Sequence, residues 1–183
     1  MIITLNGRAG GGKSSVAKAL VKRLGYRSYS AGWVRREYAL KQGMTLEELN
    51  KKAETDPASD FLVDDYMKKL GETEDNMVVE GRLCFLFIPK GIKIFLDADP
   101  LVRARRTMES DRLQETHKTI EEAVRKLKER DESDMKRYAK LYKVNPFDKK
   151  HYDLVIDTTE NTVEETTDIV YDFVMERIKQ KKM

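Results

Sequence analysis

The sequence is poor in the residues that support covalent cross-links and histidine chemistry, with one cysteine and two histidines among 183 residues. Because Cys84 is the only cysteine, no disulfide can form within the chain. His117 and His151 are isolated and provide neither a metal-ligand spacing nor a serine–histidine–aspartate arrangement. The apolar run at residues 83–88 is far shorter than the about 20 residues that a membrane-spanning helix needs. These absences argue against a disulfide-stabilised protein, a histidine-based metal centre and a membrane partner.

The sequence also lacks a strong excess of either charge. Lysine and arginine total 35 while aspartate and glutamate total 32, which gives a net charge of +3. This balance is typical of a soluble protein and argues against a general nucleic-acid or membrane binder. The first residues lack the basic and then apolar plan of a signal peptide, so we expect a cytoplasmic protein. We also expect a monomer.

Residues 7–14 read Gly-Arg-Ala-Gly-Gly-Gly-Lys-Ser, a full match to the phosphate-binding pattern G-x-x-x-x-G-K-[ST]. The pattern lies between an apolar strand-like run and a helix-like run, which is the context that a phosphate loop requires. We expect Lys13 to reach the β- and γ-phosphates of ATP and the Ser14 hydroxyl to contact Mg²⁺. An ordinary glycine-rich turn is the alternative. The predicted ATP contacts are Gly7, Arg8, Ala9, Gly10, Gly11, Gly12, Lys13, Ser14 and Ser15.

Strand-like and helix-like segments alternate along the chain, with no internal repeat. This alternation predicts a single α/β domain over residues 1–183, with a five-stranded parallel sheet between helices on both faces, a three-layer sandwich. The predicted strands are 2–6, 27–30, 77–80, 93–96 and 153–156. The predicted helices are 13–24, 32–42, 45–54, 57–70, 100–109, 119–142 and 163–178.

Polar residues follow the ends of the predicted strands, where ligands bind in parallel sheets. Arginine suits such positions because its planar guanidinium group can donate two parallel hydrogen bonds to a pair of phosphate oxygens. Glu80 ends an apolar strand, which is where phosphate-loop proteins place a carboxylate that holds Mg²⁺. The alternative for Glu80 is a strand-end acid paired with a lysine. The other residues at these positions are Ser30, Gly32, Trp33, Arg36, Gly81, Arg82, Arg103 and Arg106.

One face of the predicted helix 119–142 is apolar in its first half and charged further along. Ile120, Val124 and Leu127 form the apolar stripe, and its continuation meets Arg130, Asp131, Asp134 and Arg137. Charged residues on such a face predict that this part of the helix borders a polar cleft. The alternative is a solvated helix with ion pairs four residues apart, such as Arg130 with Asp134.

Taken together, these blocks resemble the nucleoside monophosphate kinases, most closely the archaeal-type cytidylate kinases. The resemblance covers nearly the whole chain and rests on the order and spacing of the blocks. Two departures stand out: Trp33 follows Ser30-Ala31-Gly32 where aspartate is usual, and Arg8-Ala9 replaces two common prolines. The preferred base and pentose are therefore left open.

The resemblance implies a phosphate-loop kinase fold with a helical monophosphate-binding region at about 31–71 and a small lid at about 110–118. It implies that Arg36 and Arg82 hold the acceptor phosphate, with Ser30, Gly32, Trp33 and Gly81 nearby. The family would place Lys13, Arg130 and Arg137 at the transferred phosphate, Asp134 at the acceptor sugar, and Arg103 and Arg106 on the ATP side. The implied reaction transfers a phosphoryl group from ATP to CMP, dCMP or a related monophosphate, with Mg²⁺.

Two other functions are compatible with the phosphate loop. One is a kinase for a non-nucleotide alcohol, which would need a hydroxyl-activating base. The other is a phosphate-loop ATPase that regulates a protein or RNA partner. A GTPase is disfavoured because the chain has no N-K-x-D guanine-reading motif and no D-x-x-G switch.

Overall fold

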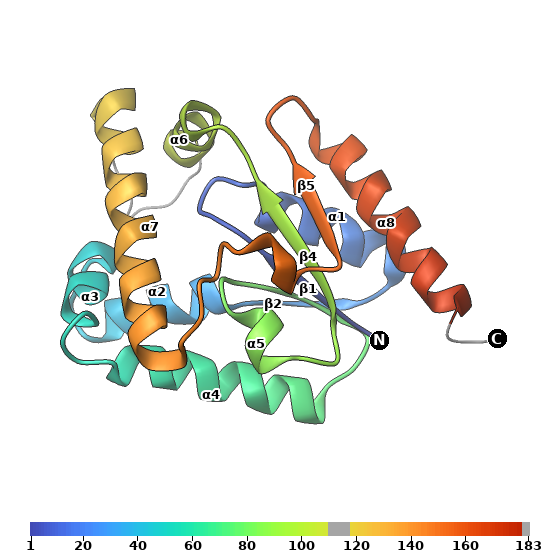
Figure 1. The fold of residues 1–183 in the computed structure, drawn as a ribbon, viewed down its shortest axis with the longest axis horizontal. Helices are drawn as coiled ribbons and strands as arrows, with labels where there is room; N and C mark the ends of the chain where they lie inside the picture. The colour runs from blue at the N-terminus through green and yellow to red at the C-terminus, as the bar shows by residue number, and fades with distance from the viewer. Residues whose placement is uncertain (110–117, 181–183) are drawn as a thin grey trace.

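A five-stranded parallel sheet forms the centre of the protein (Figure 1). The structure, a computed structural model, describes residues 1–109 and 118–180. The sheet order is β2-β3-β1-β4-β5, so the chain crosses over between strands that are not neighbours in sequence. The strands are β1 (Ile2–Asn6), β2 (Arg27–Ser30), β3 (Met77–Glu80), β4 (Ile92–Asp97) and β5 (Leu154–Asp157). The predicted parallel sheet is confirmed, with β4 longer at both ends than expected.

Helices cover both faces of this sheet. Their bounds are α1 (Lys13–Leu24), α2 (Ala31–Lys41), α3 (Leu46–Lys52), α4 (Ala58–Thr73), α5 (Cys84–Phe87), α6 (Pro100–Met108), α7 (Ile120–Tyr142) and α8 (Val163–Gln180), with a 3-10 turn at Lys149–His151. None of these helices is long and apolar enough to cross a bilayer. The short α5 was not predicted, because the apolar run at residues 83–88 was considered only as too short to span a membrane.

Two hydrophobic clusters hold the layers together. On one face, Val16 and Leu20 of α1 and Val170 of α8 pack against Ile3 and Leu5 of β1. On the other face, α4 and α5 pack against β1 and β3 through a second cluster, whose buried members are Ile2, Val63, Met67, Leu70, Met77, Val79, Cys84 and Ile88. Burial of apolar side chains on both faces explains why the strands read as continuous apolar runs.

Local signals in the sequence set several helix ends. Gly25 ends α1 with a φ of 67°, a conformation that glycine adopts without steric cost. A capping box starts α3: the Thr45 side chain accepts from the backbone N–H of Glu48, and the Glu48 side chain accepts from the backbone N–H of Thr45. Asp99 caps α6 ahead of Pro100. The predicted lid at 110–118 falls almost entirely outside the described residues and stays a prediction.

Candidate active site

The phosphate loop joins β1 to α1 and lies against the carboxyl end of β4. A Cβ atom at Gly7 would lie 1.9 Å from the Leu96 carbonyl oxygen, and Gly7 has a φ of +134°. A Cβ at Gly10 would lie 2.5 Å from the carbonyl oxygen of Arg103. Only glycine fits these two positions, because neighbouring backbone leaves no room for a side chain. Lys13 Nζ donates to the carbonyls of Gly7 at 2.9 Å and Arg8 at 2.6 Å.

A cleft of about 410 Å³ runs along this loop, within the range of about 300–1,000 Å³ typical of small-molecule sites. One end is bordered by α6 and by the loop between β5 and α8, with Arg106, Thr107, Thr158, Asn161 and Thr162 in its wall. The other end is bordered by α2, α4 and α5. The phosphate loop lies between the two ends, so the cleft has room for one ligand on each side of it.

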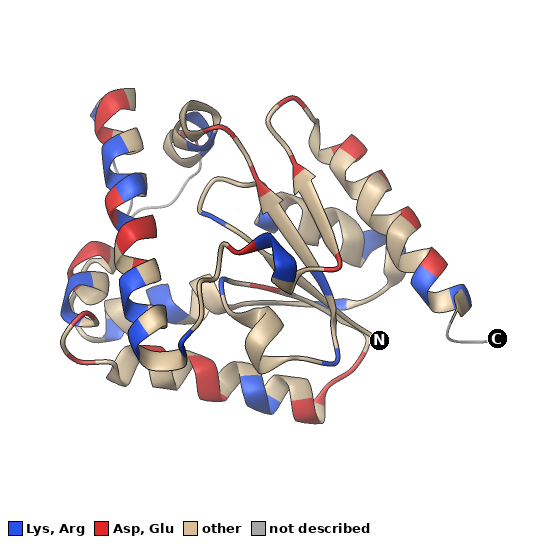
Figure 2. Ribbon diagram, viewed as in Figure 1, with Lys and Arg blue, Asp and Glu red and all other residues tan. Residues whose placement is uncertain are grey.

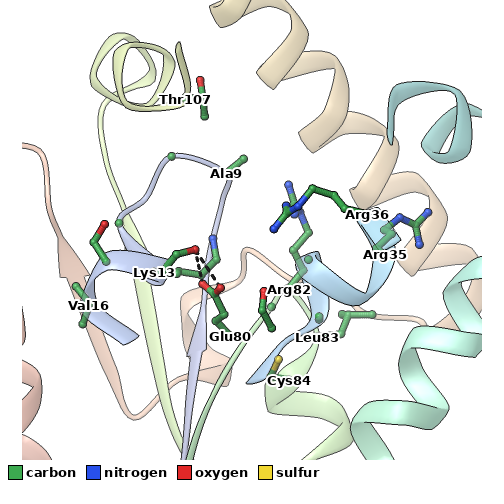
Figure 3. Close-up of a pocket in the computed structure, with 18 of the residues that line it drawn as sticks. Ala9, Lys13, Val16, Arg35, Arg36, Glu80, Arg82, Leu83, Cys84 and Thr107 are labelled. Carbon is green, nitrogen blue, oxygen red and sulfur yellow. Dashed lines mark hydrogen bonds between the residues drawn. The ribbon is translucent and has the colours of Figure 1, made fainter. Parts of the chain in front are cut away.

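Glu80 and Ser14 meet beside the phosphate loop (Figure 3). The Ser14 hydroxyl lies 3.0 Å and 2.8 Å from the two carboxylate oxygens of Glu80. Hydroxyl and carboxylate oxygens are ligands that Mg²⁺ prefers, so this pair fits a magnesium site completed by water and phosphate oxygens. Among residues 1–109 and 118–180, no group of three or more His, Cys, Asp and Glu side chains could hold a metal by itself.

Arginine side chains line the cleft opposite the phosphate loop. In Figure 3 the guanidinium group of Arg36 is turned toward the loop, whereas that of Arg35 points away from it. Arg36, Arg82 and Arg130 all line the cleft. Arg82 is largely buried and forms an ion pair with Asp134 of α7. Three positive groups therefore face the loop from α2, from the end of β3 and from α7.

Behind these arginines, a buried ion-pair network joins α2, α4 and α7. Arg137 Nε lies 2.8 Å from Asp60, and Arg137 Nη2 lies 2.7 Å from Asp134. Asp60 also accepts a hydrogen bond of 2.9 Å from Arg35. Burial alone would raise the pKa of Asp134, but the charges of Arg82 and Arg137 outweigh it and hold that pKa below its usual range. The network fixes the acceptor-side helices relative to α7.

A second set of ion pairs braces the phosphate loop itself. Arg8 pairs with Asp97 at the end of β4 and lies 3.2 Å from Asp131 of α7. Arg103 lies 2.8 Å from the same Asp131 and donates to the Ala9 carbonyl at 2.8 Å. These contacts connect the loop to α6 and α7. Arg8 and Arg103 therefore stabilise the position of the loop. The predicted contacts of these two arginines with ATP stay predictions.

The charged face predicted for the helix at 119–142 is buried in α7. Asp131 is 8% exposed, Asp134 3% and Arg137 4%. Figure 2 shows charges of both signs along this helix, so charge alone does not separate the buried face from the solvent face. The alternative of a fully solvated helix is therefore wrong for this stretch. Each buried charge has an ion-pair partner, which makes the burial possible. The pairs are Asp131 with Arg8 and Arg103, Asp134 with Arg82 and Arg137, and Arg137 with Asp60.

The structure brings most of the predicted site residues to the cleft. Those that line it are Ala9, Gly10, Gly12, Lys13, Ser14, Ser15, Ser30, Gly32, Arg36, Glu80, Gly81, Arg82, Arg106 and Arg130. Those that do not line it are Gly7, Arg8, Gly11, Arg103, Asp134 and Arg137. Trp33 is 58% exposed and does not line the cleft, so its predicted contact with the acceptor stays a prediction.

Several residues of the cleft were not predicted from the sequence. Thr158 accepts a 2.9 Å hydrogen bond from Arg106 at the donor end, and Thr162 lies in the same wall. Arg35, Asp60 and Asp64 line the acceptor end. The only signal for Asp60 and Asp64 was their spacing of four residues in a helix, which places both on one face. Nothing in the sequence distinguished that face from a solvated one.

Asp64 has an unusual electrostatic setting. Burial raises the pKa of its carboxyl group to about 7, although the hydrogen bond donated by the Tyr142 hydroxyl acts to lower it. In the unfolded chain the pKa of this group is near 3.8, the ordinary value for an aspartate side chain. The folded protein therefore binds this proton more tightly than the unfolded chain does. The stability that it contributes is complete below about pH 4 and is lost as the pH rises through about 7.

This linkage predicts a pH-dependent difference between wild type and Asp64→Asn. Relative to the variant, the wild type should lose about 2–4 kcal/mol of stability between pH 4 and pH 8, since one pKa unit corresponds to about 1.4 kcal/mol. Urea unfolding of both proteins at several pH values measures the difference. Asp65→Asn is the matched control, because the Asp65 side chain is 76% exposed. A constant difference between Asp64→Asn and wild type across this range would contradict the raised pKa.

Solved structures with a similar fold include a shikimate kinase and an uncharacterised protein. Shikimate kinase from Bacteroides thetaiotaomicron matches with a TM-score of 0.67 at 17% identity, covering 96% of this chain and 98% of that one. An uncharacterised protein from Eubacterium ventriosum matches with a TM-score of 0.66 at 21% identity, covering 95% and 98% of the two chains. At these identities the likeness shows the fold alone.

Sequence comparison is more specific. The chain is 36% identical over 185 residues to a cytidylate kinase from Thermoplasma volcanium, with 99% of this chain and 95% of that protein covered. It is 38% identical over 160 residues to a cytidylate kinase from Pyrococcus furiosus, with 87% and 80% covered. The model of the cytidylate kinase-like family matches residues 2–160. With its phosphate loop, its opposing arginines and these matches, the chain belongs to the cytidylate kinase-like family.

Proposed function

We propose that the protein is a cytidylate kinase that converts ATP and CMP or dCMP into ADP and CDP or dCDP. The observation that carries the proposal is the cleft itself, in which a phosphate loop faces Arg36, Arg82 and Arg130 across a space for a second phosphate. The family membership supports the same reaction. Because the reaction uses ATP and Mg²⁺, both plentiful in the cytoplasm, we propose a cytoplasmic enzyme, and we expect it to be a monomer.

The phosphate loop would bind the triphosphate of ATP. Its backbone N–H groups and the N-terminus of α1 favour negative charge, and Lys13 adds a point charge near the β- and γ-phosphates. Ser14 and Glu80 would hold Mg²⁺, which, when bound, supplies positive charge to the donor phosphates. Arg106 and Thr158 would border the nucleoside of ATP at the donor end of the cleft.

The acceptor needs no strong base. Its phosphate group has a second pKa of about 6 and so carries a free oxyanion near neutral pH. That oxygen attacks the γ-phosphorus of ATP, the bond from this phosphorus to the β,γ-bridging oxygen breaks, and ADP leaves. The work of the protein is to align the two phosphates and to neutralise their charge with Lys13, Arg36, Arg82 and Arg130.

An ADP-release assay with a panel of nucleoside monophosphates tests the proposal. We expect ADP formation to require a monophosphate and to be fastest with CMP or dCMP. Release that is indifferent to the panel but increases with an RNA or protein partner would favour a regulatory ATPase. Release that requires a non-nucleotide alcohol would favour a small-molecule kinase. Either of these two results would overturn the proposal.

Arg36→Ala is expected to weaken binding of the acceptor monophosphate and to leave ATP binding nearly unchanged. The side chain points into the cleft from α2, on the acceptor side, and a hydrogen bond to a charged group contributes about 1.5–3 kcal/mol. The KM for CMP should therefore rise about tenfold or more, with the KM for ATP nearly unchanged. Steady-state kinetics with each substrate varied in turn measures both values.

Lys41→Ala is the matched control for this prediction, because Lys41 is exposed at the end of the same helix. Its kinetics should equal those of wild type. Arg82→Ala is a less clean test, since it also leaves the buried Asp134 with one partner fewer. Equal rises in both KM values for Arg36→Ala would show that Arg36 does not serve the acceptor alone.

A further inference from the structure

Arg8 belongs to the phosphate loop, but its side chain is directed to other parts of the protein. The next residue, Ala9, lines the cleft, whereas Arg8 does not. The Arg8 side chain is 26% exposed and forms ion pairs with two carboxylates that belong to β4 and α7. A guanidinium group that is engaged in this way is placed to act on the protein around it rather than on a ligand in the cleft.

Three groups hold the guanidinium group of Arg8. Its Nη1 forms an ion pair with Asp97 at the end of β4. Its Nε lies 3.2 Å from Oδ2 of Asp131 on α7. The third group is the ring of Phe147, whose centroid lies 4.1 Å from Cζ of Arg8, within the range of a cation–π contact. Because the guanidinium group is planar, contacts with two of its nitrogens and with one of its faces fix both its position and its orientation.

Phe147 is itself held in place. It lies in the segment between α7 and the 3-10 turn and is buried. Its backbone N–H donates to Oδ1 of Asn145 at 3.0 Å. The carbonyl of the preceding residue, Pro146, accepts a hydrogen bond from the Tyr152 hydroxyl. These contacts fix the backbone on which the ring is carried, so the ring is a fixed support for the Arg8 side chain.

Asp131 connects Arg8 to Arg130. The same Oδ2 of Asp131 that pairs with Arg8 also accepts from Nη2 of Arg103 at 2.8 Å, so one buried oxygen joins the phosphate loop and α6 to α7. Arg130 is the adjacent residue and lines the cleft, whereas Asp131 does not, because successive residues of a helix point in different directions. Both residues belong to one turn of α7, so a shift of Asp131 would also move Arg130.

We propose that Arg8 is a positioning residue for phosphoryl transfer: it ties Asp131, and with it Arg130, to the loop that binds ATP. The place of Arg130 relative to the donor phosphates is then set before the acceptor binds. A misplacement of about 1 Å can cost about 10²-fold in rate, so Arg8 affects kcat without contact with either substrate. The inference rests on the proposed function, which assigns Arg130 to the transferred phosphate.

The first test compares kcat with the two KM values. Arg8→Met keeps an unbranched side chain and removes the guanidinium group, so kcat should fall about tenfold or more while the KM values for ATP and CMP change little. Phe147→Leu removes only the ring and should lower kcat by a smaller factor. Arg105→Met is the matched control, because Arg105 is exposed on α6, and it should keep wild-type kinetics. Melting curves establish that each variant is folded.

A double-mutant cycle with Arg130→Ala distinguishes positioning from a general loss of stability. If Arg8 acts through Arg130, Arg8→Met should lower kcat no further once the Arg130 side chain is absent. Effects of the two substitutions that multiply in the double variant would overturn the inference. Wild-type kcat in folded Arg8→Met or folded Phe147→Leu would also overturn it. A rise in the KM for ATP with normal kcat would overturn it as well, because Arg8 would then bind ATP directly.

Amide hydrogen exchange provides a measurement that does not depend on transfer. ATP without CMP should slow exchange of the α7 amides near Asp131 in wild type, and Arg8→Met should abolish this protection. If the protection depends on Arg8 but wild type transfers no phosphoryl group to CMP, the positioning role is supported and the kinase is refuted. If wild type does transfer to CMP, and Arg8→Met changes neither kcat nor the protection of α7, the kinase is supported and the positioning role is refuted.

Discussion

Lys13→Ala is expected to lower kcat by about 10²-fold or more while the protein remains folded. Lys13 lies at the start of α1 and lines the cleft. Its ammonium group is held at the phosphate loop, because it donates hydrogen bonds to the carbonyl oxygens of Gly7 and Arg8. Removal of one preorganised contact to the developing charge typically costs about 10²–10³ in kcat. Steady-state kinetics with saturating ATP and CMP measures the loss.

Lys18→Ala is the matched control for that experiment, because Lys18 is exposed on the same helix. It should retain wild-type kcat, which would exclude a general effect of lost positive charge on α1. If folded Lys13→Ala had a kcat near that of wild type, the proposed role of the phosphate loop in phosphoryl transfer would be contradicted.

Arg130→Ala is expected to lower kcat and kcat/KM together by about 10²-fold or more, with both nucleotides still bound. Arg130 lies on α7, which is fixed on one side by the Asp131 contacts to the phosphate loop and on the other by the Asp134 contacts to Arg82. Its side chain lines the cleft. A group placed at the transferred phosphate acts mainly in the transition state, so ground-state binding changes little.

Arg125→Ala controls for the loss of an arginine from α7. Arg125 is 60% exposed and forms an ion pair of 2.7 Å with Glu129, a pair of the kind that contributes less than about 1 kcal/mol. This variant should have wild-type kinetics and a nearly unchanged melting temperature. If Arg130→Ala had a normal kcat and only a small fall in melting temperature, Arg130 would form a surface ion pair like that of Arg125. The proposed catalytic role of Arg130 would then be contradicted.

The sequence predicted the fold and the phosphate side of the cleft because local patterns determine both. Glycine is required where a Cβ atom would clash with the backbone of Leu96 or Arg103, and these glycines are recognisable in the sequence as a motif. Apolar strands and helix caps are recognisable in the same way. The change from apolar to charged residues along α7 predicted that this stretch borders a polar cleft, and Arg130 does line the cleft, whereas Asp131, Asp134 and Arg137 are buried. The sequence comparisons and the sheet topology confirm the family and the fold.

The acceptor end was less predictable, because its residues act through partners far away in sequence. Arg35 meets Asp60 across 25 residues, and Tyr142 meets Asp64 across 78. No local pattern distinguishes such residues from solvated ones. Trp33 was assigned to the substrate because it follows Ser30-Ala31-Gly32 in the family resemblance, whereas the residue is 58% exposed and does not line the cleft. The short α5 was missed because four apolar residues carry no helical period.

Transfer of a labelled γ-phosphate tests the central claim most directly. The protein would be incubated with Mg²⁺, CMP and ATP that carries a radioactive γ-phosphate, and the products would be separated. The proposed function predicts that the label appears in CDP, in an amount equal to the ADP formed. Label that appears only in inorganic phosphate, at a rate that CMP does not change, would contradict it.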